Sequence, residues 1–137
     1  MALTLRLVIV TPESIAFDDH VNMVTLPCVQ GQLGIYPLHV PLITQMVPGE
    51  ASFEKDGKET FLAVGEGIVD ISADEVSIVT DMAIAADNID AAKAEEARQR
   101  AATRLREKLS DEEVASVNAS LVRSLAQLQV KRRRRTV

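Results

Sequence analysis

The composition of the chain changes at Asp87, and this change constrains the fold more than any other feature of the sequence. Before it, short apolar stretches are separated by Pro, Gly and Asp about every eight to twelve residues. From Ile89 to the C-terminus there is neither Gly nor Pro, and Ala, Glu, Arg and Leu dominate. Because glycine and proline interrupt helices, we expect two parts, a β-domain over 1–86 and a helical part over 87–137.

The first part has the pattern of an antiparallel β-sandwich. Apolar residues alternate with polar ones near the N-terminus, as in a strand with one buried face, with Leu3, Leu5, Leu7 and Ile9 on one side and Thr4 and Arg6 on the other. Further strands are expected at 21–26, 32–35, 42–47, 51–55, 59–64, 69–72 and 75–79. Asp56-Gly57 predicts a tight hairpin, because glycine tolerates the positive φ that a type I′ turn requires. Hydrophobic residues make up 47% of the chain but aromatic residues only 3%, so the core must be aliphatic.

The second part is predicted to be a helical hairpin. Asp87 or Asn88 is expected to cap the first helix, with Asp90 in its first turn. An apolar stripe follows at helical spacing, formed by Ala94, Ala97, Ala101, Leu105 and Leu109. Ser110 and Glu113 form a capping-box pattern, which indicates that a second helix begins there. Its apolar face is expected to contain Val114, Val117, Leu121, Leu125 and Leu128.

The seam of this hairpin is rich in alanine, and alanine side chains bury little apolar area. At about 25 cal/mol per Å² such a helix pair is held weakly. We therefore expect the hairpin to need a partner, either the sandwich or another protein, and to be able to exchange between them. The predicted fold class is α+β, a sandwich followed by an antiparallel αα-hairpin.

Charge is distributed unevenly along the chain. The net charge is −5, yet five of the 15 basic residues lie in the last seven positions, Lys131 to Val137. The tail is therefore strongly basic and the rest strongly acidic. Two interpretations stay open: a solvated terminus, or a contact with an acidic protein surface or anionic lipid. Nucleic acid is the weaker candidate, because the acidic body would oppose it and no aromatic stacking platform is visible.

Residues that could form a catalytic or metal site are few. The two histidines, His20 and His39, do not occur at metal-ligand spacing. The single cysteine, Cys28, excludes an internal disulfide, and no local pattern supports a nucleophile–base pair with His39. No phosphate-binding loop of the GxxxxGK[ST] type occurs. An enzyme that uses Cys28 is therefore the weakest hypothesis, and no metal or required cofactor is expected.

Membrane insertion is not expected either. The chain has no apolar run of about 18 residues, and its first ten residues alternate rather than forming a signal peptide. We expect the chain to be cytosolic or to face the cytosol.

A stretch rich in glycine and proline carries the most specific pattern. From Leu26 to Leu42 its sequence is LPCVQGQLGIYPLHVPL. It resembles the signature of the ε subunit of F-type ATP synthases, which begins with Leu-Pro, continues with G-x-L-G-I-x-P and ends with H-x-P-L. Segments similar to those of the family also occur, in the family's order, at 11–13 before this stretch and at 48–49, 63–67 and 89–90 after it. The resemblance therefore covers nearly the whole chain. Cys28, Leu38 and Glu66 stand where many relatives have glycine.

The resemblance implies a non-catalytic rotor subunit of the central stalk in a proton-translocating F-type ATP synthase. Such a subunit couples the catalytic head to the c-ring and inhibits ATP hydrolysis through its C-terminal helices. Its partners would be the γ subunit, the c-ring and the β subunit. The expected location is peripheral, on the cytoplasmic side of a bacterial plasma membrane, and sodium remains an alternative coupling ion. By the same mapping, the candidate contacts with the c-ring and γ are Gly31, Gln32, Leu33, His39 and Pro41, with Gln32 and His39 in one foot region. Gln32 would offer a hydrogen bond where many relatives have a carboxylate.

Two further sites follow from the resemblance. Some bacterial members bind ATP through I-D-x-x-R-A and later arginines, which correspond here to Ile89, Asp90, Lys93, Arg100 and Arg104. Lys93 keeps the charge of arginine but not its bidentate donor geometry. A solvated helix face is the alternative to regulatory ATP. In the family the inhibitory helix meets an acidic loop of the β subunit, and the candidates for that contact are Arg123, Lys131, Arg132, Arg133, Arg134 and Arg135.

A different class of protein also fits the pattern. The alternative to a rotor subunit is a free-standing β-sandwich binding module whose helical hairpin mediates self-association. A pocket lined by convergent polar residues in the sandwich would favour the module, whereas a flat apolar sandwich face would favour the rotor subunit.

Overall fold

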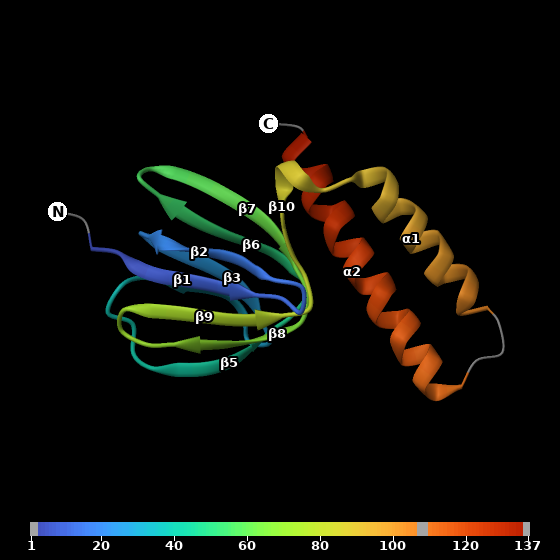
Figure 1. Ribbon diagram of the computed structural model, residues 1–137, viewed down its shortest axis with the longest axis horizontal. Helices are drawn as coiled ribbons and strands as arrows, with labels where there is room; N and C mark the ends of the chain where they lie inside the picture. Colours follow the sequence, from blue (N-terminus) through green and yellow to red (C-terminus); the bar gives the residue numbers. More distant parts are fainter. Residues whose placement is uncertain (1–2, 107–109, 136–137) are drawn as a thin grey trace.

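Ten β-strands precede a 3-10 helix and two α-helices in the part of the chain that the computed structural model describes, residues 3–106 and 110–135 (Figure 1). The strands are β1 (Leu5–Val10), β2 (Ile15–Val21), β3 (Met23–Cys28), β4 (Gly31–Ile35), β5 (Leu42–Met46), β6 (Gly49–Lys55), β7 (Lys58–Val64), β8 (Gly67–Ile71), β9 (Glu75–Thr80) and β10 (Ala83–Ala85). The helices are η1 (Ala86–Asn88), α1 (Ala91–Arg104) and α2 (Asp111–Arg135).

The strands form one sheet that folds over into a sandwich. Their order is β10-β7-β6-β3-β5-β8-β9-β1-β2. Strand β4 lies outside this order and pairs with β3. Strands β3 and β5 are joined by a single residue pair, Cys28 with Met46, so the sheet bends there into two layers. At the far edge, β2 returns towards β6, where the rings of Phe17 and Phe53 lie 4.5 Å apart. The predicted sandwich is confirmed.

The core between the layers is aliphatic, as the composition predicts. Leu5, Leu7 and Ile9 of β1 are almost fully buried, whereas Leu3 lies before the strand and is exposed. The other large buried side chains include Val21, Val24, Leu26, Ile35, Met46, Val64, Val69, Ile71, Val76 and Ile78. None of the members of this core belongs to the hairpin.

Two strands lie outside the sequence prediction, and one pairing differs from it. In strand β2 one face is exposed, with Ala16, Asp18 and His20, whereas the other face places a half-buried Asp19 between Phe17 and Val21 and therefore shows no clear apolar alternation in the sequence. It is held by backbone pairing with β1, by the Arg6–Asp18 ion pair (2.9 Å) and by the Lys55–Asp19 ion pair. These cations hold the pKa values of the Asp18 and Asp19 carboxyls below their usual range through hydrogen bonds. Strand β10 has only three residues. The pairing of β1 with β9 is parallel, so the sheet is mixed rather than purely antiparallel.

The Asp56-Gly57 turn agrees with the prediction. Both residues have positive φ, 53° and 81°, as a type I′ turn requires. The side chain of Asn22 accepts a hydrogen bond from the backbone N–H of Asp56 at 2.9 Å. The turn is thereby tied to the neighbouring end of β2.

Helix α1 begins later than the sequence pattern predicts. Residues Ala86–Asn88 form η1, and Asp90 rather than Asp87 or Asn88 is the N-cap. The Asp90 carboxylate accepts hydrogen bonds from the N–H groups of Ala92 and Lys93, at 3.0 and 3.2 Å. Ala94 and Ala101 of the predicted stripe are buried, and Leu109 lies outside the described residues.

Helix α2 begins where the capping box predicts. The N–H of Glu113 donates to Ser110 Oγ at 3.2 Å, and that hydroxyl donates to the Glu113 carboxylate at 3.0 Å. The carboxylate thus binds the hydroxyl rather than a backbone N–H. The predicted apolar face is partly wrong, because Leu125 is exposed and Ser124, Ala126 and Val130 are buried. Helix α2 lies between α1 and the sandwich, so it needs two buried sides rather than one (Figure 1).

Candidate functional site

The hairpin meets the sandwich through the second half of α2. A small apolar cluster forms there, separate from the sandwich core, and consists of Ala63, Met82, Ala86, Ile89, Ala126 and Val130. We call it the interdomain cluster. Its members come from β7, the segment around β10 and η1, and the end of α2. Half of its members are alanines, so most of the apolar area that it buries comes from Met82, Ile89 and Val130, and that area is modest.

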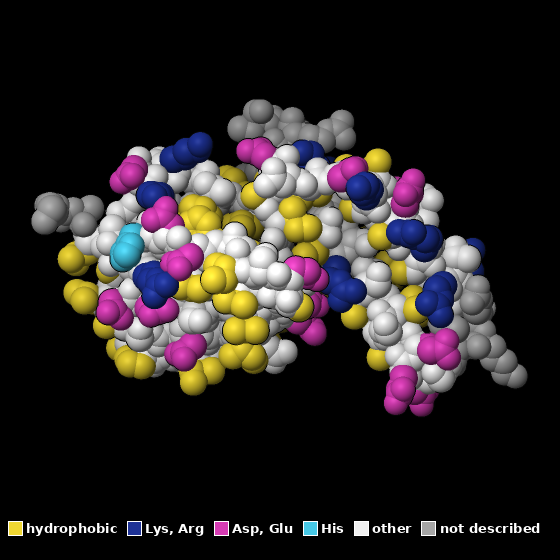
Figure 2. Space-filling model, viewed as in Figure 1, with side chains coloured by type: hydrophobic (Ala, Val, Ile, Leu, Met, Phe, Trp, Pro, Cys, Tyr) yellow, Lys and Arg dark blue, Asp and Glu magenta, His cyan; other side chains and the backbone are white. Residues whose placement is uncertain are grey.

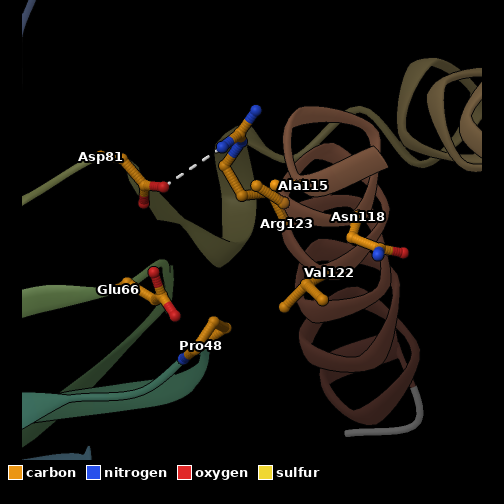
Figure 3. Close-up of a pocket in the computed structure, with 8 residues that line it drawn as sticks. Pro48, Glu66, Asp81, Ala115, Asn118, Val122 and Arg123 are labelled. Carbon is orange, nitrogen blue, oxygen red and sulfur yellow. Dashed lines mark hydrogen bonds and ion pairs between the residues drawn. The ribbon is translucent and has the colours of Figure 1, made fainter. Parts of the chain in front are cut away.

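Four polar contacts accompany the interdomain cluster. Arg123 Nη1 lies 3.2 Å from a carboxylate oxygen of Asp81 (Figure 3). Gln127 Nε2 lies 2.9 Å from the sulfur of Met82, and Lys131 Nζ donates to the Ala86 carbonyl oxygen at 3.3 Å. Arg133 pairs with the largely buried Glu50 at 3.4 Å. All four start from the second half of α2.

The first half of α2 stands apart from the sandwich. A cleft of about 270 Å³ separates Pro48, Glu66 and Asp81 from the α2 residues Ala115, Asn118, Ala119, Val122 and Arg123 (Figure 3). Asp81 and Arg123, which form the ion pair, both line this cleft. The hairpin is therefore attached to the sandwich at one end and open at the other.

Gly65 gives Asp81 the space to reach Arg123. A Cβ atom at position 65 would overlap the Asp81 carboxylate. That carboxylate is the end of a movable side chain, so a larger residue would displace it rather than break the sheet. A glycine at this position therefore serves the interdomain ion pair.

The ATP candidates do not form one site. Ile89 is buried in the interdomain cluster, and the Asp90 carboxylate already occupies the N-terminus of α1. Lys93 is exposed about two helical turns before Arg100. Arg100 and Arg104, by contrast, line a groove of about 420 Å³ between α1 and α2.

This groove gathers positive charge from both helices. Arg123 of α2 joins Arg100 and Arg104 at its rim, while Ser116 and Ser120 add hydroxyl groups. One of the arginines, Arg104, pairs with Glu113 at 3.5 Å. We call the groove lined by Arg100, Arg104 and Arg123 the arginine groove. Sequence reasoning missed Arg123 as part of it, because that residue belongs to the other helix.

The candidate contacts with the c-ring and γ are also divided. Gly31, Gln32 and Leu33 lie at the start of β4, beside the last residue of β3, Cys28, which pairs with Gly31 on one strand and Met46 on another. His39 and Pro41 lie in the loop after β4, where the N–H of Leu38 bonds to the turn between β8 and β9. Gln32 therefore lies near the first residue of β4, and His39 lies beyond its last residue, Ile35. Gly31 has φ of +113° in the turn between β3 and β4, a conformation that favours glycine.

The loop that contains His39 is apolar and exposed. Tyr36, Leu38 and Val40 each present most of their side chains to solvent. Leu38 has φ of +68°, and its N–H donates to the Ala73 carbonyl at 2.7 Å. A leucine in the left-handed region is strained by roughly 1 kcal/mol relative to glycine.

A second apolar surface crosses the outer face of the sandwich, and sequence reasoning missed it. Ile68 of β8 lies opposite Val79 of β9, which lies opposite Val10 of β1, which in turn lies opposite Ile15 of β2. We call these four residues the outer apolar row. Three of them, Ile15, Ile68 and Val79, are more than half exposed. Figure 2 shows hydrophobic side chains gathered over the β8–β9 part of the sandwich. The signal in the sequence was an apolar residue on the polar side of each strand.

Most of the basic candidates for the β subunit are engaged within the chain. Arg123, Lys131 and Arg133 make the contacts with the sandwich given above. The hydrogen bond from Arg98 holds the pKa of the Glu95 carboxyl in α1 below its usual range, and the charge of Arg132 lowers it slightly further. Arg134 and Arg135 lie in the last turn of α2, and their side chains are outside the described part of the chain.

Catalytic chemistry finds no support in the geometry. Cys28 is buried, and burial raises the pKa of its thiol, which disfavours the reactive thiolate. His39 Nδ1 lies 2.6 Å from the carbonyl oxygen of Val40. Among the described residues, no group of His, Cys, Asp and Glu could hold a metal ion. None of the described helices has the length and apolar character needed to span a membrane.

Comparison with known proteins identifies the family. The model of the ATP synthase delta/epsilon chain β-sandwich domain matches residues 4–86, and that of the long α-helix domain of the same chain matches 87–132. The chain is 37% identical over 131 residues to the ATP synthase epsilon chain of Herpetosiphon aurantiacus, covering 96% of each. It is 34% identical over 127 residues to that of Ruthia magnifica, covering 93% of this chain and 92% of the relative.

Solved structures share the fold. A chain from the Euglena gracilis mitochondrial ATP synthase superposes with a TM-score of 0.73 at 19% identity, covering 92% of this chain and 79% of that one. A chain from the Tetrahymena thermophila enzyme gives 0.63 at 14% identity, covering 94% and 97%. With both family models matched in order and relatives similar over nearly their whole length, the chain belongs to the delta/epsilon chain family of ATP synthases.

Proposed function

We propose that the chain is a non-catalytic subunit of the central stalk of an F-type ATP synthase, where it couples the catalytic head to the c-ring. The bacterial epsilon chains cited above support this function. So do the solved relatives, whose structures are described as F1 with a c-ring in Euglena and as a central stalk with a c-ring in Tetrahymena. The observation on this chain that carries the proposal is the outer apolar row, because exposed apolar patches mark protein contacts.

Separate surfaces of the sandwich suit separate partners. The outer apolar row offers an apolar face to the γ subunit. Gly31, Gln32 and Leu33 would meet the c-ring, with the amide of Gln32 as a hydrogen-bonding group. His39 and Pro41 belong to the exposed apolar loop after β4 and would form a second contact with the rotor. In this arrangement 1–86 is the docking domain, and 87–137 is the regulatory domain.

The hairpin supplies regulation. While it is closed on the sandwich, Arg123, Lys131 and Arg133 are engaged by Asp81, Ala86 and Glu50. Once the hairpin opens, these cations become free for an acidic surface of the catalytic β subunit, where the extended helices would block ATP hydrolysis. Closed and open hairpins would thus use the same side chains for different partners.

The proposed membership of an ATP synthase complex also implies a cellular location for the chain. A proton-translocating ATP synthase would hold this chain peripherally on the cytoplasmic side of a bacterial plasma membrane. The bacterial origin of the epsilon chains above is consistent with that placement.

The test is reconstitution of an F-type complex depleted of its ε subunit. The full chain is expected to inhibit ATP hydrolysis, whereas a version that ends at Ala86 is expected to bind without inhibiting. The shorter version should fold, because no described residue of the hairpin belongs to the sandwich core. Circular dichroism would confirm that it does.

Other outcomes separate the two roles. Equal inhibition by both versions would leave the rotor role intact and remove regulation by the hairpin. Failure of both to bind would overturn the proposed function.

A second candidate function is regulatory binding of ATP, and the arginine groove favours it. Arg100, Arg104 and Arg123 converge there with two serine hydroxyls, a donor set suited to phosphate oxygens. Ile89 and Asp90 would act by positioning α1 rather than by contacting the nucleotide. Isothermal titration should show binding to the full chain and at least about a tenfold weaker affinity after Arg100→Ala, a loss of one charge-assisted contact. No heat at millimolar ATP would remove this candidate.

A further inference from the structure

The end of α2 packs on the segment that joins the sandwich to the hairpin. That segment is η1 with Ile89, and both Ala86 and Ile89 belong to the interdomain cluster. Val130 of α2 is the most buried member of the hairpin in that cluster, with 1% of its surface exposed. The two ends of the helical part, the first residues after β10 and the last turns of α2, therefore touch each other.

Lys131 adds a polar contact to the same segment. Its Nζ donates to the Ala86 carbonyl oxygen at 3.3 Å. That oxygen also accepts the Ile89 N–H at 3.4 Å, which is the hydrogen bond that closes η1. The side chain of Lys131 thus supports the one turn that gives the connecting segment its shape.

Helix α1 contributes little to this attachment. It packs against α2, and the main contacts of the helical part with β6, β7 and η1 are made by α2. The buried residues between the two helices, among them Ala94, Ala101 and Val117, lie outside the interdomain cluster. The helix pair could therefore leave the sandwich without coming apart.

From these contacts we infer that Ala126, Val130 and Lys131 form a clamp that holds the connecting segment 86–89 folded. The hairpin then opens only when these three residues lose their contacts with that segment. The clamp deepens the proposed regulatory role and rests on it. It places control of the hinge at the C-terminal end of the chain, about 40 residues after the hinge itself. The hinge and the clamp are in contact in the closed state, so opening is one cooperative step.

Two valines of α2 give a matched test on the full chain. Val130 is 1% exposed and Val122 is 43% exposed, and both become alanine. Because alanine favours a helix more than valine does, neither change weakens α2 through helix propensity. Hydrogen exchange of the amides in 86–90, measured by NMR, reports opening of the connecting segment.

Val130→Ala is expected to speed exchange in 86–90 at least about tenfold, and Val122→Ala less than about twofold. Exchange in the sandwich core and between α1 and α2 should stay within about twofold of the unchanged chain. Lys131→Ala should speed exchange in 86–90 about threefold, and Lys131→Arg, which keeps a donor, should restore most of the protection. These results would establish the clamp.

Equal effects of the two valine substitutions would overturn the clamp, as would a uniform rise of exchange across the whole chain after both Val130→Ala and Lys131→Ala. The measurement needs no ATP synthase, so its failure is separate from failure of the proposed function. An opened segment in Val130→Ala without any change in inhibition of the complex would support the clamp and count against the regulatory role.

Discussion

Replacing Leu7 by alanine is expected to lower the free energy of unfolding of the chain by about 3 kcal/mol. Leu7 lies in the middle of β1, is 1% exposed and belongs to the aliphatic core between the layers. The substitution removes three buried carbons, the Cγ and the two methyl groups, and leaves a cavity in a region fixed by strands on both sides. Urea unfolding followed by circular dichroism measures the loss.

Leu3→Ala is the matched control for this prediction. Leu3 has the same side chain but lies before β1 with 64% of its surface exposed. Its substitution should change the free energy of unfolding by no more than about 0.5 kcal/mol. Similar losses for Leu3→Ala and Leu7→Ala would contradict the burial pattern of β1.

Replacing Gly67 by alanine is expected to cost about 2–3 kcal/mol through crowding. A Cβ atom there would overlap the carbonyl oxygen of Val79 and lie 3.0 Å from the Cβ of Thr80. Both belong to β9, which is paired on its other side with β1, so the neighbouring backbone cannot retreat easily. The midpoint of thermal unfolding should fall by several degrees.

Gly34→Ala controls for the general effect of adding a methyl group to a strand glycine. A Cβ atom at position 34 would make only an ordinary contact, 3.5 Å from the Met23 Cε. Its φ lies outside the left-handed region, so the substitution should be nearly neutral, with a small gain from restricting the unfolded chain. A loss at position 34 as large as at position 67 would mean that crowding against β9 is not the cause.

The strands that the sequence predicts are those with one buried face. In β1, β8 and β9, every second side chain is buried, and this alternation is visible in the sequence. Strand β2 was not predicted, because contacts with its neighbours rather than an apolar alternation stabilise it. Its aspartates pair with Arg6 and Lys55. The parallel pairing of β1 with β9 was not predicted either, because the alternation of apolar residues does not indicate whether two paired strands run in the same direction.

The sequence predicted the start of the second helix correctly but not the start of the first. The second helix begins at a capping box whose two residues both contribute, Ser110 and Glu113. The start of the first helix was predicted too early, with Asp87 or Asn88 as the cap and Asp90 in the first turn, whereas Asp90 is the cap. The interdomain cluster decides between these caps, because burying Ala86 and Ile89 folds the preceding residues into η1.

The family was recognisable from the sequence, and the site was not. The resemblance carried by Leu26 to Leu42 is confirmed by the family models, and membership sets aside both the free-standing module and the enzyme that uses Cys28. The contacts between hairpin and sandwich join residues that lie more than 40 positions apart, such as Asp81 and Arg123. No periodicity connects such positions, so the interdomain contacts and the arginine groove emerge only in three dimensions.

The parallel pairing of β1 with β9 has a consequence for biosynthesis. Strand β1 is synthesised before the other strands of the sheet but lies between β2 and β9, and β9 ends at Thr80. Since β1 stays unpaired on one side until that strand is made, the nascent chain carries an unpaired strand edge while the residues between β1 and β9 are synthesised, a state prone to misassembly. The helices are translated last, so they meet a sandwich whose sheet is already complete.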